Sequence, residues 1–322
     1  MGIGPTELEV WGEKFENTTL VEGFILLGLV TRPSLEKLLF VILAATYIMT
    51  IIGNFLIIGI IRIDSRLHTP MYFFLLHLAL IETLYTTTVT PNTLKNLLHE
   101  DKRISFAGCL IQMFLFISLG GSECVLLGTM AYDRYVAICH PLLYPTIMNQ
   151  SFCLQLALTC WAIGLLNSLM HTILTSRLPF CNDFHIQHYF CEIPAILKLS
   201  CQDIFLNELL VFIFGGCITV SSLTLTLVSY ASVVTTVLRI PGKTMKYKTF
   251  STCSSHLIVV SIFFGTVISI YLFPVSQSST DHDRVISIVY GVLTPLFNPI
   301  IYSFRNKEFQ KAMKKLLNMR VA

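Results

Sequence analysis

Asp133 and Arg134 stand side by side at the end of a long apolar segment. They fall in Met130–Pro141, which reads MAYDRYVAICHP, and the preceding Ile111–Met130 carries one charge, Glu123. Such a segment has roughly the twenty residues that a helix needs to cross a bilayer, so the pair would lie at a membrane surface. An Arg that can leave one carboxylate for another partner is a two-state element, because the free energy of such a pair depends on its burial. This chemistry indicates a switch rather than a catalyst.

Glu82 and Glu123 are the two acids inside apolar segments. A charge near the bilayer centre is costly and usually faces the interior of a helix bundle. Glu123 and Arg134 are eleven residues apart, close to three helical turns, so they share one face of a helix. Steps of three and four residues continue that face through Gly120 and Phe116. The face predicts either a ligand pocket near Phe116 and Gly120 or close helix packing by small residues, and the pattern does not separate the two.

The composition is that of an integral membrane protein. The chain has 322 residues, of which 54% are hydrophobic and 13% charged, and its mean hydropathy is +0.70. We expect an all-α membrane protein, a seven-transmembrane helix bundle with a short C-terminal amphipathic interfacial helix. The expected spans are 36–61, 70–98, 105–133, 152–174, 205–238, 250–273 and 284–304. The domain layout is then a segment 1–35, the bundle 36–304 and a cytoplasmic helix and tail 305–322.

Charge asymmetry predicts the orientation of these spans. The segments that follow spans 1, 3, 5 and 7 carry thirteen of the twenty-two basic residues and three acids. The opposite face carries nine basic and fourteen acidic residues, so the positive-inside rule places the N-terminus outside the cell and the C-terminus in the cytoplasm. Juxtamembrane Lys and Arg are normally satisfied by anionic membrane lipids, which argues against nucleic acid as a partner.

The first thirty-five residues have no basic n-region, and their longest apolar run, Phe24–Val30, is short for a signal peptide, so no cleaved signal is expected. Asn17-Thr18-Thr19 is an N-glycosylation sequon on the predicted outer side. Four cysteines also fall at the outer boundary, where disulfides persist. They are Cys109, Cys181, Cys191 and Cys201, which allow three pairings, and four free thiols are the less favoured alternative.

The last span contains Pro295-Leu296-Phe297-Asn298-Pro299. Two prolines remove backbone donors and favour a bend, and the Asn298 amide can bond the freed carbonyls or the acids Glu82 and Glu123. Tyr302 and Tyr230 are candidates to hydrogen-bond near Arg134 after a rearrangement, although tyrosines at a membrane interface are often plain anchors. After the span, Lys307–Met319 places apolar and basic residues on opposite faces and predicts an interfacial helix.

Several motifs occur in one order along nearly the whole chain. They are Phe24–Gly28, Gly53-Asn54, Leu67–Leu75 (LHTPMYFFL), Met130–Pro141, Ser229-Tyr230, Lys248–Leu257 (KTFSTCSSHL) and Pro295–Lys307. With these motifs the sequence resembles the olfactory (odorant) receptors, a family of rhodopsin-like G-protein-coupled receptors. The resemblance implies a multi-pass protein of the plasma membrane that binds a small volatile odorant and activates a heterotrimeric G protein of the stimulatory, olfactory type, which raises cyclic AMP.

The resemblance also implies roles for individual residues. Arg134, freed from Asp133, would contact the G protein, and the switch residues would be Asp133, Arg134, Tyr135, Tyr230, Asn298, Pro299 and Tyr302. The implied disulfides are Cys109–Cys191 and Cys181–Cys201. The odorant pocket would lie between spans 3, 5 and 6 and be mostly apolar. Its lining would be Phe116, Ile117, Gly120, Gly121, His171, Gly215, Ile218, Phe264, Val267 and Tyr271.

Two positions depart from the family's usual pattern. Glu82 stands where the family usually has Asp, and His77 where it usually has Asn. A sodium ion between Glu82, Glu123 and Asn298 is therefore in doubt, and a proton on one acid is the alternative, because two neighbouring carboxylates repel each other when both are ionised. His188–Glu192 resembles a metal-binding spacing, but Cys191 is better used in a disulfide, so no metal and no cofactor are expected.

Three other function classes can be weighed. A transporter could use the two buried acids, but the chain lacks the paired broken helices of repeated halves. No HExxH or GxSxG site is present, so an enzyme is not expected. A non-olfactory chemoreceptor on the same scaffold is the closest alternative.

Overall fold

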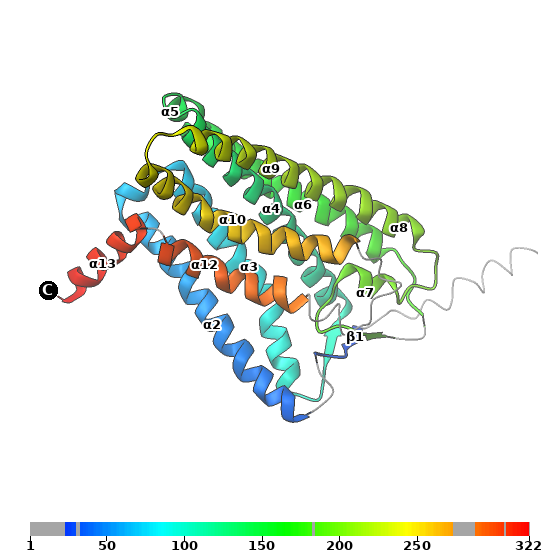
Figure 1. The fold of residues 1–322 in the computed structure, drawn as a ribbon. Coiled ribbons are helices and arrows are strands. Elements are labelled where there is room, and N and C mark those ends of the chain that lie inside the picture. Colours follow the sequence, from blue (N-terminus) through cyan, green and yellow to red (C-terminus); the bar gives the residue numbers. More distant parts are fainter. Residues whose placement is uncertain (1–22, 30–32, 182–183, 273–286, 306, 322) are drawn as a thin grey trace, which may run out of the picture.

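The computed structural model describes residues 23–29, 33–181, 184–272, 287–305 and 307–321. Within them the long helices lie alongside one another as a bundle (Figure 1). Their bounds are α2 (Pro33–Ile63), α3 (Pro70–Leu98), α4 (Phe106–Cys139), α6 (Gln150–Ser176), α9 (Gly216–Arg239), α10 (Lys243–Leu272) and α12 (Thr294–Arg305). These helices match the seven expected spans, and most extend a few residues beyond the expected ends.

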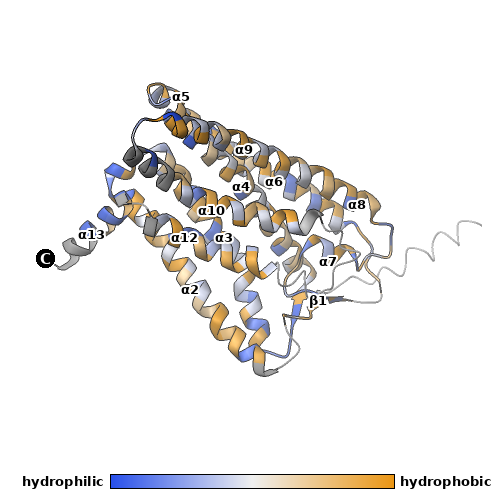
Figure 2. Ribbon diagram, in the orientation of Figure 1, coloured by the Kyte–Doolittle hydropathy of each residue, from blue (hydrophilic) through white to orange (hydrophobic). Residues whose placement is uncertain are grey.

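Five of the helices are long and apolar enough to cross a membrane, with α8 (Phe205–Leu210) and a π-helical turn, Val211–Gly215, continuing into α9. Two shorter apolar stretches, Cys253–Ser269 and Val289–Tyr302, belong to the sixth and seventh spans. Apolar residues cover much of the outward faces of these helices, as Figure 2 shows. An apolar exterior is what a helix bundle presents to lipid, so the seven-span membrane fold follows from length, composition and the outer surface together.

A small sheet that the sequence analysis did not anticipate lies at one end of the bundle, which we call the sheet end. Its strands are β1 (Gly23–Leu26), β2 (Arg103–Ser105) and β3 (His185–Ile186), in the order β2-β1-β3. β1 pairs antiparallel with β2 and parallel with β3. A Cβ on Gly23 would lie 2.4 Å from the carbonyl oxygen of Ile104, so this strand approaches its neighbour too closely for any other residue.

The opposite end, which we call the tail end, carries α13 (Lys307–Val321) beyond α12 (Figure 1). Two short elements also lie there, the 3-10 turn Ser65–Leu67 between α2 and α3 and α5 (Tyr144–Ile147) after α4. The remaining short helix is α7 (Ile193–Leu197). It belongs to the segment that joins α6 to α8 at the sheet end, which we call the long loop. α13 exposes Glu308, Lys311, Lys314 and Lys315 and buries Phe309 and Ala312, as expected of an amphipathic helix.

The seventh span is irregular where two prolines were expected to bend it. A π-helical turn, Val289–Leu293, precedes α12, and the hydroxyl of Thr294 donates to the carbonyl of Val289 at 3.2 Å. Pro295 falls in the first turn of α12, where a missing N–H costs little, and Pro299 lies inside the helix. A Cβ on Gly53 would lie 3.0 Å from Cβ of Pro299, so the glycine lets α2 approach α12 closely.

α4 is the central helix. It contacts α3, α6, α9 and α10 along its length (Figure 1). Its sheet end is held by Cys109, and its tail end carries Asp133 and Arg134. α4 therefore contacts several neighbouring helices and extends between the two ends of the bundle.

Candidate functional site

Arg134 and Asp133 form an ion pair at the tail end of α4. The Arg134 Nε donates to Oδ2 of Asp133 at 3.0 Å, and Nη2 donates to the same oxygen. The Asp133 side chain is 1% exposed and that of Arg134 is 13% exposed. Burial removes both charges from water, so each depends on the other for stabilisation. The sequence predicted that this pair lies at a membrane surface, and in the fold it lies at the tail end of the bundle.

The second oxygen of Asp133 is occupied by a residue that the sequence analysis missed. The Tyr144 hydroxyl, from α5, donates to Oδ1 of Asp133 at 2.8 Å. Burial, followed by the negative charge of Asp133, raises the pKa of Tyr144 above its ordinary value, so the hydroxyl keeps its proton and remains a donor. No periodicity links Tyr144 to Asp133, because the chain turns between them. Tyr135, which the sequence grouped with the switch, bonds the exposed His140 at 3.0 Å instead.

Tyr230 also has a partner that the sequence analysis did not assign. Its hydroxyl lies 2.7 Å from Nδ1 of His256 on α10, and both side chains are buried. The bond ties α9 to α10 in the half of the bundle that contains Arg134. His256 could have been found by the rule that an ionisable residue inside a span is a functional candidate, which was applied only to acids. The Tyr302 hydroxyl is buried without a hydrogen-bond partner among the described residues.

The acids Glu82 and Glu123 are both buried in the middle of the bundle, at 1% and 3% exposure. The Asn298 amide donates to Oε1 of Glu82, which joins the second and seventh spans as expected from the sequence. Oε1 of Glu123 is buried without a hydrogen-bond partner in the described part of the chain. Such a group is costly unless a proton, an ion or water satisfies it. We call these three buried residues the polar centre; the core also buries other polar side chains, such as Asn54 and Ser122.

His77, the other departure from the family pattern, faces away from this polar centre. Its Nδ1 accepts from the Trp161 indole of α6 at 3.3 Å, and its ring packs 4.7 Å from that of Phe73. The substitution at His77 therefore concerns the packing of α3 against α6. The proposed ion site depends on Glu82, Glu123 and Asn298.

Phe116 lies at the centre of an aromatic cluster near the sheet end of α4. Its ring stacks on that of Tyr85 with centroids 4.9 Å apart, and it lies 4.7 Å from Phe190 and 5.7 Å from Tyr290. These three partners come from α3, the long loop and the seventh span, which the sequence could not bring together. Phe116 is the one member that the sequence analysis selected.

The other predicted lining residues divide between two environments. Phe264 is buried in the main apolar core, against which Phe116, Ile218 and Val267 also pack, while Ile117 packs in a separate cluster under the loop. A Cβ on Gly120 would meet Tyr85 at 3.7 Å, so this glycine borders the aromatic cluster.

Gly121 belongs to a helix contact rather than to that cluster. A Cβ on Gly121 would lie 3.3 Å from Cα of Gly164, and one on Gly164 would lie 2.2 Å from the carbonyl oxygen of Ser118. Helices α4 and α6 thus meet at backbone distance, which is the packing role that the sequence left open for the glycines of this stretch. The inclusion of Gly121 in the pocket lining stays a prediction.

His171 and Gly215 complete the predicted lining. His171 is buried on α6, and among the described residues no hydrogen bond holds it. A Cβ on Gly215 would meet nothing within 4 Å, so this position is not needed for close packing. The side chain of Tyr271 and residue Asn17 with its sequon lie outside the described residues.

The long loop is fastened over the sheet end. The structure has the disulfides Cys109–Cys191 and Cys181–Cys201, the pairing that the family resemblance implied. Gln112 reinforces the first bond, because its Oε1 accepts from the Cys191 amide at 2.9 Å while its Nε2 donates to the Thr88 carbonyl at 3.0 Å. α3, α4 and the loop are thereby joined beside Phe116.

The loop also reaches the seventh span. The Tyr290 hydroxyl donates to Oε1 of Glu192 at 3.0 Å, and Nε2 of His188 lies 3.0 Å from the Ser287 hydroxyl and 3.6 Å from Glu192. Within the described ranges no three His, Cys, Asp or Glu side chains are grouped as a metal ion would need. The motif His188–Glu192 thus connects the loop to the bundle.

The comparisons with known proteins agree on one family. Residues 43–320 match the family model described as "Olfactory receptor". The chain is 48% identical to human olfactory receptor 2A1/2A42 over 94% of this chain and 97% of the relative. It is 45% identical to mouse olfactory receptor 5AP2 over 95% and 97%, and 46% identical to human olfactory receptor 6N1 over 94% and 96%. Such relatives are multi-pass membrane receptors and are not enzymes. This chain therefore belongs to the olfactory receptor family and is an odorant receptor with the seven-span fold of G-protein-coupled receptors.

Proposed function

We propose that this receptor binds small volatile, mostly apolar molecules between α4, α9 and α10, and that binding activates a stimulatory G protein of the olfactory type, which raises cyclic AMP. The observation that carries the proposal is the arrangement along α4, where Phe116 lies in an aromatic cluster and Arg134 in a buried ion pair. At about 1.5 Å per residue, these positions are separated by roughly 27 Å of one helix.

The ligand class follows from the side chains around Phe116. Tyr85, Phe190, Tyr290 and Phe264 offer large apolar faces, which favour a ligand whose affinity comes from burial. Tyr271 and His171 would supply the hydrogen bond that orients the molecule.

Activation would proceed by release of Arg134 from Asp133. In the closed arrangement both oxygens of Asp133 are occupied, one by Arg134 and one by Tyr144. A ligand that favours a different packing of α4, α9 and α10 would favour the released state in proportion to its differential affinity for the two states. The freed guanidinium would then contact the C-terminal helix of the G protein, with Tyr230 and Tyr302 stabilising the open state.

The polar centre would be the part of the bundle that moves. Asn298 and Pro299 lie in the irregular seventh span, and the bond from Asn298 to Glu82 links that span to α3. A sodium ion bound at the polar centre, or a proton on Glu123, would change how readily the bond between Asn298 and Glu82 breaks when the seventh span moves.

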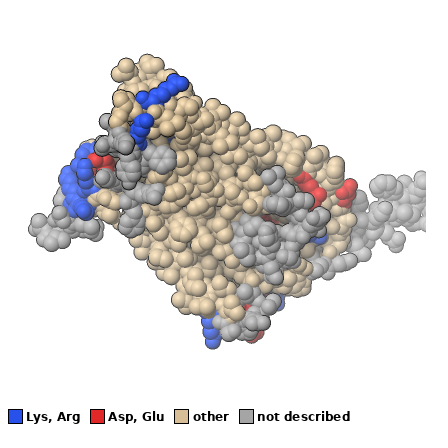
Figure 3. All heavy atoms as spheres, viewed as in Figure 1, with Lys and Arg blue, Asp and Glu red and all other residues tan. Residues whose placement is uncertain are grey.

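The receptor would lie in the plasma membrane with its N-terminus outside and its C-terminus in the cytoplasm. Most Lys and Arg residues visible in Figure 3 gather at the tail end, which supports a cytoplasmic tail end. In this orientation residues 1–35 are extracellular, 36–304 form the bundle and 305–322 form the cytoplasmic helix and tail. Asn17 would then be accessible for glycosylation, and both disulfides would face the oxidising side.

A cyclic AMP assay against a panel of volatile molecules tests this function. Cells that express the receptor at their surface should respond to at least one member in a concentration-dependent manner, and cells without it should not. If the receptor responds to none of the volatile molecules but does respond to non-volatile ligands in the same assay, it would be a chemoreceptor of another kind. Substrate uptake that depends on Glu82 and Glu123, without any cyclic AMP response, would contradict the proposal and favour a transporter.

A further inference from the structure

Tyr290 of the seventh span contacts the aromatic cluster with its ring and the long loop with its hydroxyl. The ring centroid lies 5.7 Å from that of Phe116, and the hydroxyl donates to Oε1 of Glu192 at 3.0 Å. Glu192 directly follows Cys191, whose disulfide to Cys109 fastens this part of the loop to α4. The bond between Tyr290 and Glu192, which we call the latch, therefore ties the seventh span to a fixed point beside the aromatic cluster.

The surroundings of the latch shield it from water. The Glu192 side chain is 18% exposed and that of His188 is 5% exposed. Nε2 of His188 lies 3.0 Å from the Ser287 hydroxyl, and Ser287 is also buried. A hydrogen bond to a carboxylate is about twice as strong as one between neutral groups, and partial burial limits the competition from water. These polar contacts hold the start of the seventh span against the loop.

The seventh span is irregular at the latch. Tyr290 lies in the π-helical turn Val289–Leu293, and α12 follows this turn directly. Single π-helical turns bend helices and are frequent at functional sites. Further along, the Asn298 amide donates to Glu82 in the polar centre, about 12 Å from Tyr290 at about 1.5 Å per residue. The seventh span is thus held by the latch near the sheet end and by Asn298 in the polar centre.

We propose that the latch stabilises the closed receptor and that an odorant activates the receptor by displacing the Tyr290 hydroxyl from Glu192. This inference rests on the function proposed above, because it concerns the regulation of the same site. The latch and the ion pair of Arg134 with Asp133 are formed together, so both belong to one arrangement. An odorant that packs against Phe116 lies beside the Tyr290 ring, and a shift of that ring moves the hydroxyl away from the carboxylate. The start of the seventh span is then released from the loop.

Tyr290→Phe tests the latch, because it removes the hydroxyl and keeps the ring beside Phe116. At matched surface expression its basal cyclic AMP signal should rise about tenfold, the population shift expected from losing one hydrogen bond to a charged group. The ratio of the odorant-stimulated signal to the basal signal should fall by a similar factor, because the latch is already open. Glu192→Ala should also raise the basal signal. Adding Tyr290→Phe to Glu192→Ala should change that signal by less than about twofold, because the same bond is removed only once.

Tyr189→Phe is the matched control. Tyr189 is buried in the same loop, and a Cβ on Gly291 of the seventh span would lie 3.5 Å from its hydroxyl, so this residue also lies at the contact between loop and span. Its hydroxyl has no hydrogen-bond partner among the described residues. Tyr189→Phe should therefore leave the basal signal unchanged.

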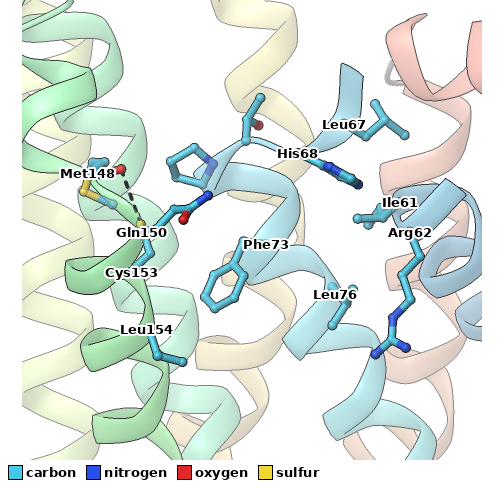
Figure 4. Close-up of a pocket in the computed structure, with 12 residues that line it drawn as sticks. Ile61, Arg62, Leu67, His68, Phe73, Leu76, Met148, Gln150, Cys153 and Leu154 are labelled. Carbon is cyan, nitrogen blue, oxygen red and sulfur yellow. Dashed lines mark hydrogen bonds between the residues drawn. The ribbon is translucent and has the colours of Figure 1, made fainter. Parts of the chain in front are cut away.

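A second control concerns a half-open cavity of about 450 Å³ at the tail end, which has Phe73 and Leu154 on its wall (Figure 4). Neither Phe116 nor Tyr290 lines this cavity, so an odorant bound there would not act on the latch directly. Leu154→Trp fills part of the cavity and should leave the odorant response unchanged. A response that is lost in Leu154→Trp but unchanged in Tyr290→Phe would place the action of the odorant at the tail end and would overturn the proposal.

Hydrogen exchange measured by mass spectrometry tests the latch without the G protein. In the purified full-length receptor without odorant, the amides of residues 287–293 should exchange faster in Tyr290→Phe than in the wild type and Tyr189→Phe, while those of α6 should not change. Glu192→Ala serves for the same comparison if Tyr290→Phe fails to reach the cell surface.

Equal exchange and equal basal signals in the wild type and Tyr290→Phe would overturn the latch. Faster exchange with an unchanged basal signal, in a receptor that responds to odorant, would mean that the bond is structural only and would overturn the proposal as well. Faster exchange in a receptor that gives no cyclic AMP response to any volatile molecule would contradict the function proposed above while supporting the latch as a restraint on the seventh span.

Discussion

The Tyr144 hydroxyl and the Asp133 carboxylate are joined by a hydrogen bond of 2.8 Å, and this bond connects the loop helix α5 to the end of α4. Arg134 occupies the other oxygen of the same carboxylate. Asp133 is thus held by one partner from its own helix and one from the loop. The loop contributes to the stability of the closed ion pair, so a change in the loop should alter how readily Arg134 is released.

Tyr144→Phe should raise the basal cyclic AMP signal. The change removes one hydrogen bond from a buried carboxylate, worth about 1.5–3 kcal/mol for a charged group, and so shifts the closed and open populations by about tenfold or more. Tyr132→Phe is the matched control, because Tyr132 directly precedes Asp133 but its hydroxyl makes no hydrogen bond among the described residues, and it should leave the basal signal unchanged. Equal basal signals in wild type and Tyr144→Phe at matched surface expression would remove Tyr144 from the closed state.

The bond from Tyr144 should also be insensitive to physiological pH. Burial and Asp133 raise the pKa of Tyr144, so the protonated hydroxyl stabilises the closed state at any pH below the ordinary tyrosine pKa. This stabilisation is lost only when the pH rises through the raised pKa. The difference in basal signal between wild type and Tyr144→Phe should therefore be constant from about pH 6 to 8, well below the ordinary pKa of tyrosine. A difference that disappears within this range would contradict the assigned donor.

Phe116→Ala should weaken the response to an activating odorant. Phe116 contacts three aromatic residues from different elements, and its truncation would remove apolar surface from the proposed pocket. The loss of about 2–4 kcal/mol would raise the half-maximal odorant concentration by roughly thirty- to a thousandfold. Leu115→Ala is the control on the same helix, because Leu115 is 39% exposed on the outside of the bundle. Concentration–response curves in cyclic AMP measure both, and equal shifts would indicate a loss of folding rather than of a pocket.

Asn298→Leu should destabilise the receptor more than Glu82→Gln. The first change leaves the buried Glu82 carboxylate without its amide donor, at a cost of about 1–3 kcal/mol, whereas the second replaces the acid by a neutral side chain of the same shape that can still bond Asn298. Thermal unfolding of the purified variants in one detergent compares them. A lower melting temperature for Glu82→Gln than for Asn298→Leu would mean that the charge of Glu82, through a bound ion, is what stabilises the centre.

Gly164→Ala should lower the thermal stability, and Gly59→Ala should not. A Cβ on Gly164 would overlap the Ser118 carbonyl at 2.2 Å, so α4 and α6 would have to separate, at a cost of about 1–3 kcal/mol or more. Gly59 is also helical, but its Cβ would meet nothing within 4 Å, and alanine there gains about 1 kcal/mol in helix propensity. Equal melting temperatures for the two variants would show that the contact between α4 and α6 adjusts freely.

Local sequence patterns were sufficient for the spans and for the ion pair. Hydropathy over about twenty residues locates a membrane helix without knowledge of its neighbours. Asp133 and Arg134 are adjacent in the chain, so their pairing needs no tertiary information. The bond between Glu82 and Asn298 was one of the alternatives that the sequence offered, beside Glu123 and the carbonyls freed by the prolines.

Contacts between distant segments could not be predicted in the same way. Tyr144 reaches Asp133 through a turn, and the ring of Phe190 reaches Phe116 from a loop that is placed by a disulfide and by contacts with distant segments. The sheet of β1 to β3 joins segments of only four, three and two residues, which are too short for an alternating pattern to identify them as strands. Gly121 shows the limit within one helix, since a three- to four-residue stripe is wide enough to include both the aromatic cluster and the contact with Gly164.

The response of Arg134→Ala to an activating odorant tests the central claim most directly. With the variant and the wild type at equal surface expression, odorant binding is measured by displacement of a labelled ligand and signalling by cyclic AMP. We predict that Arg134→Ala binds the odorant but gives no rise in cyclic AMP, because it lacks the group released from Asp133 to contact the G protein. A full cyclic AMP response from Arg134→Ala would contradict the account.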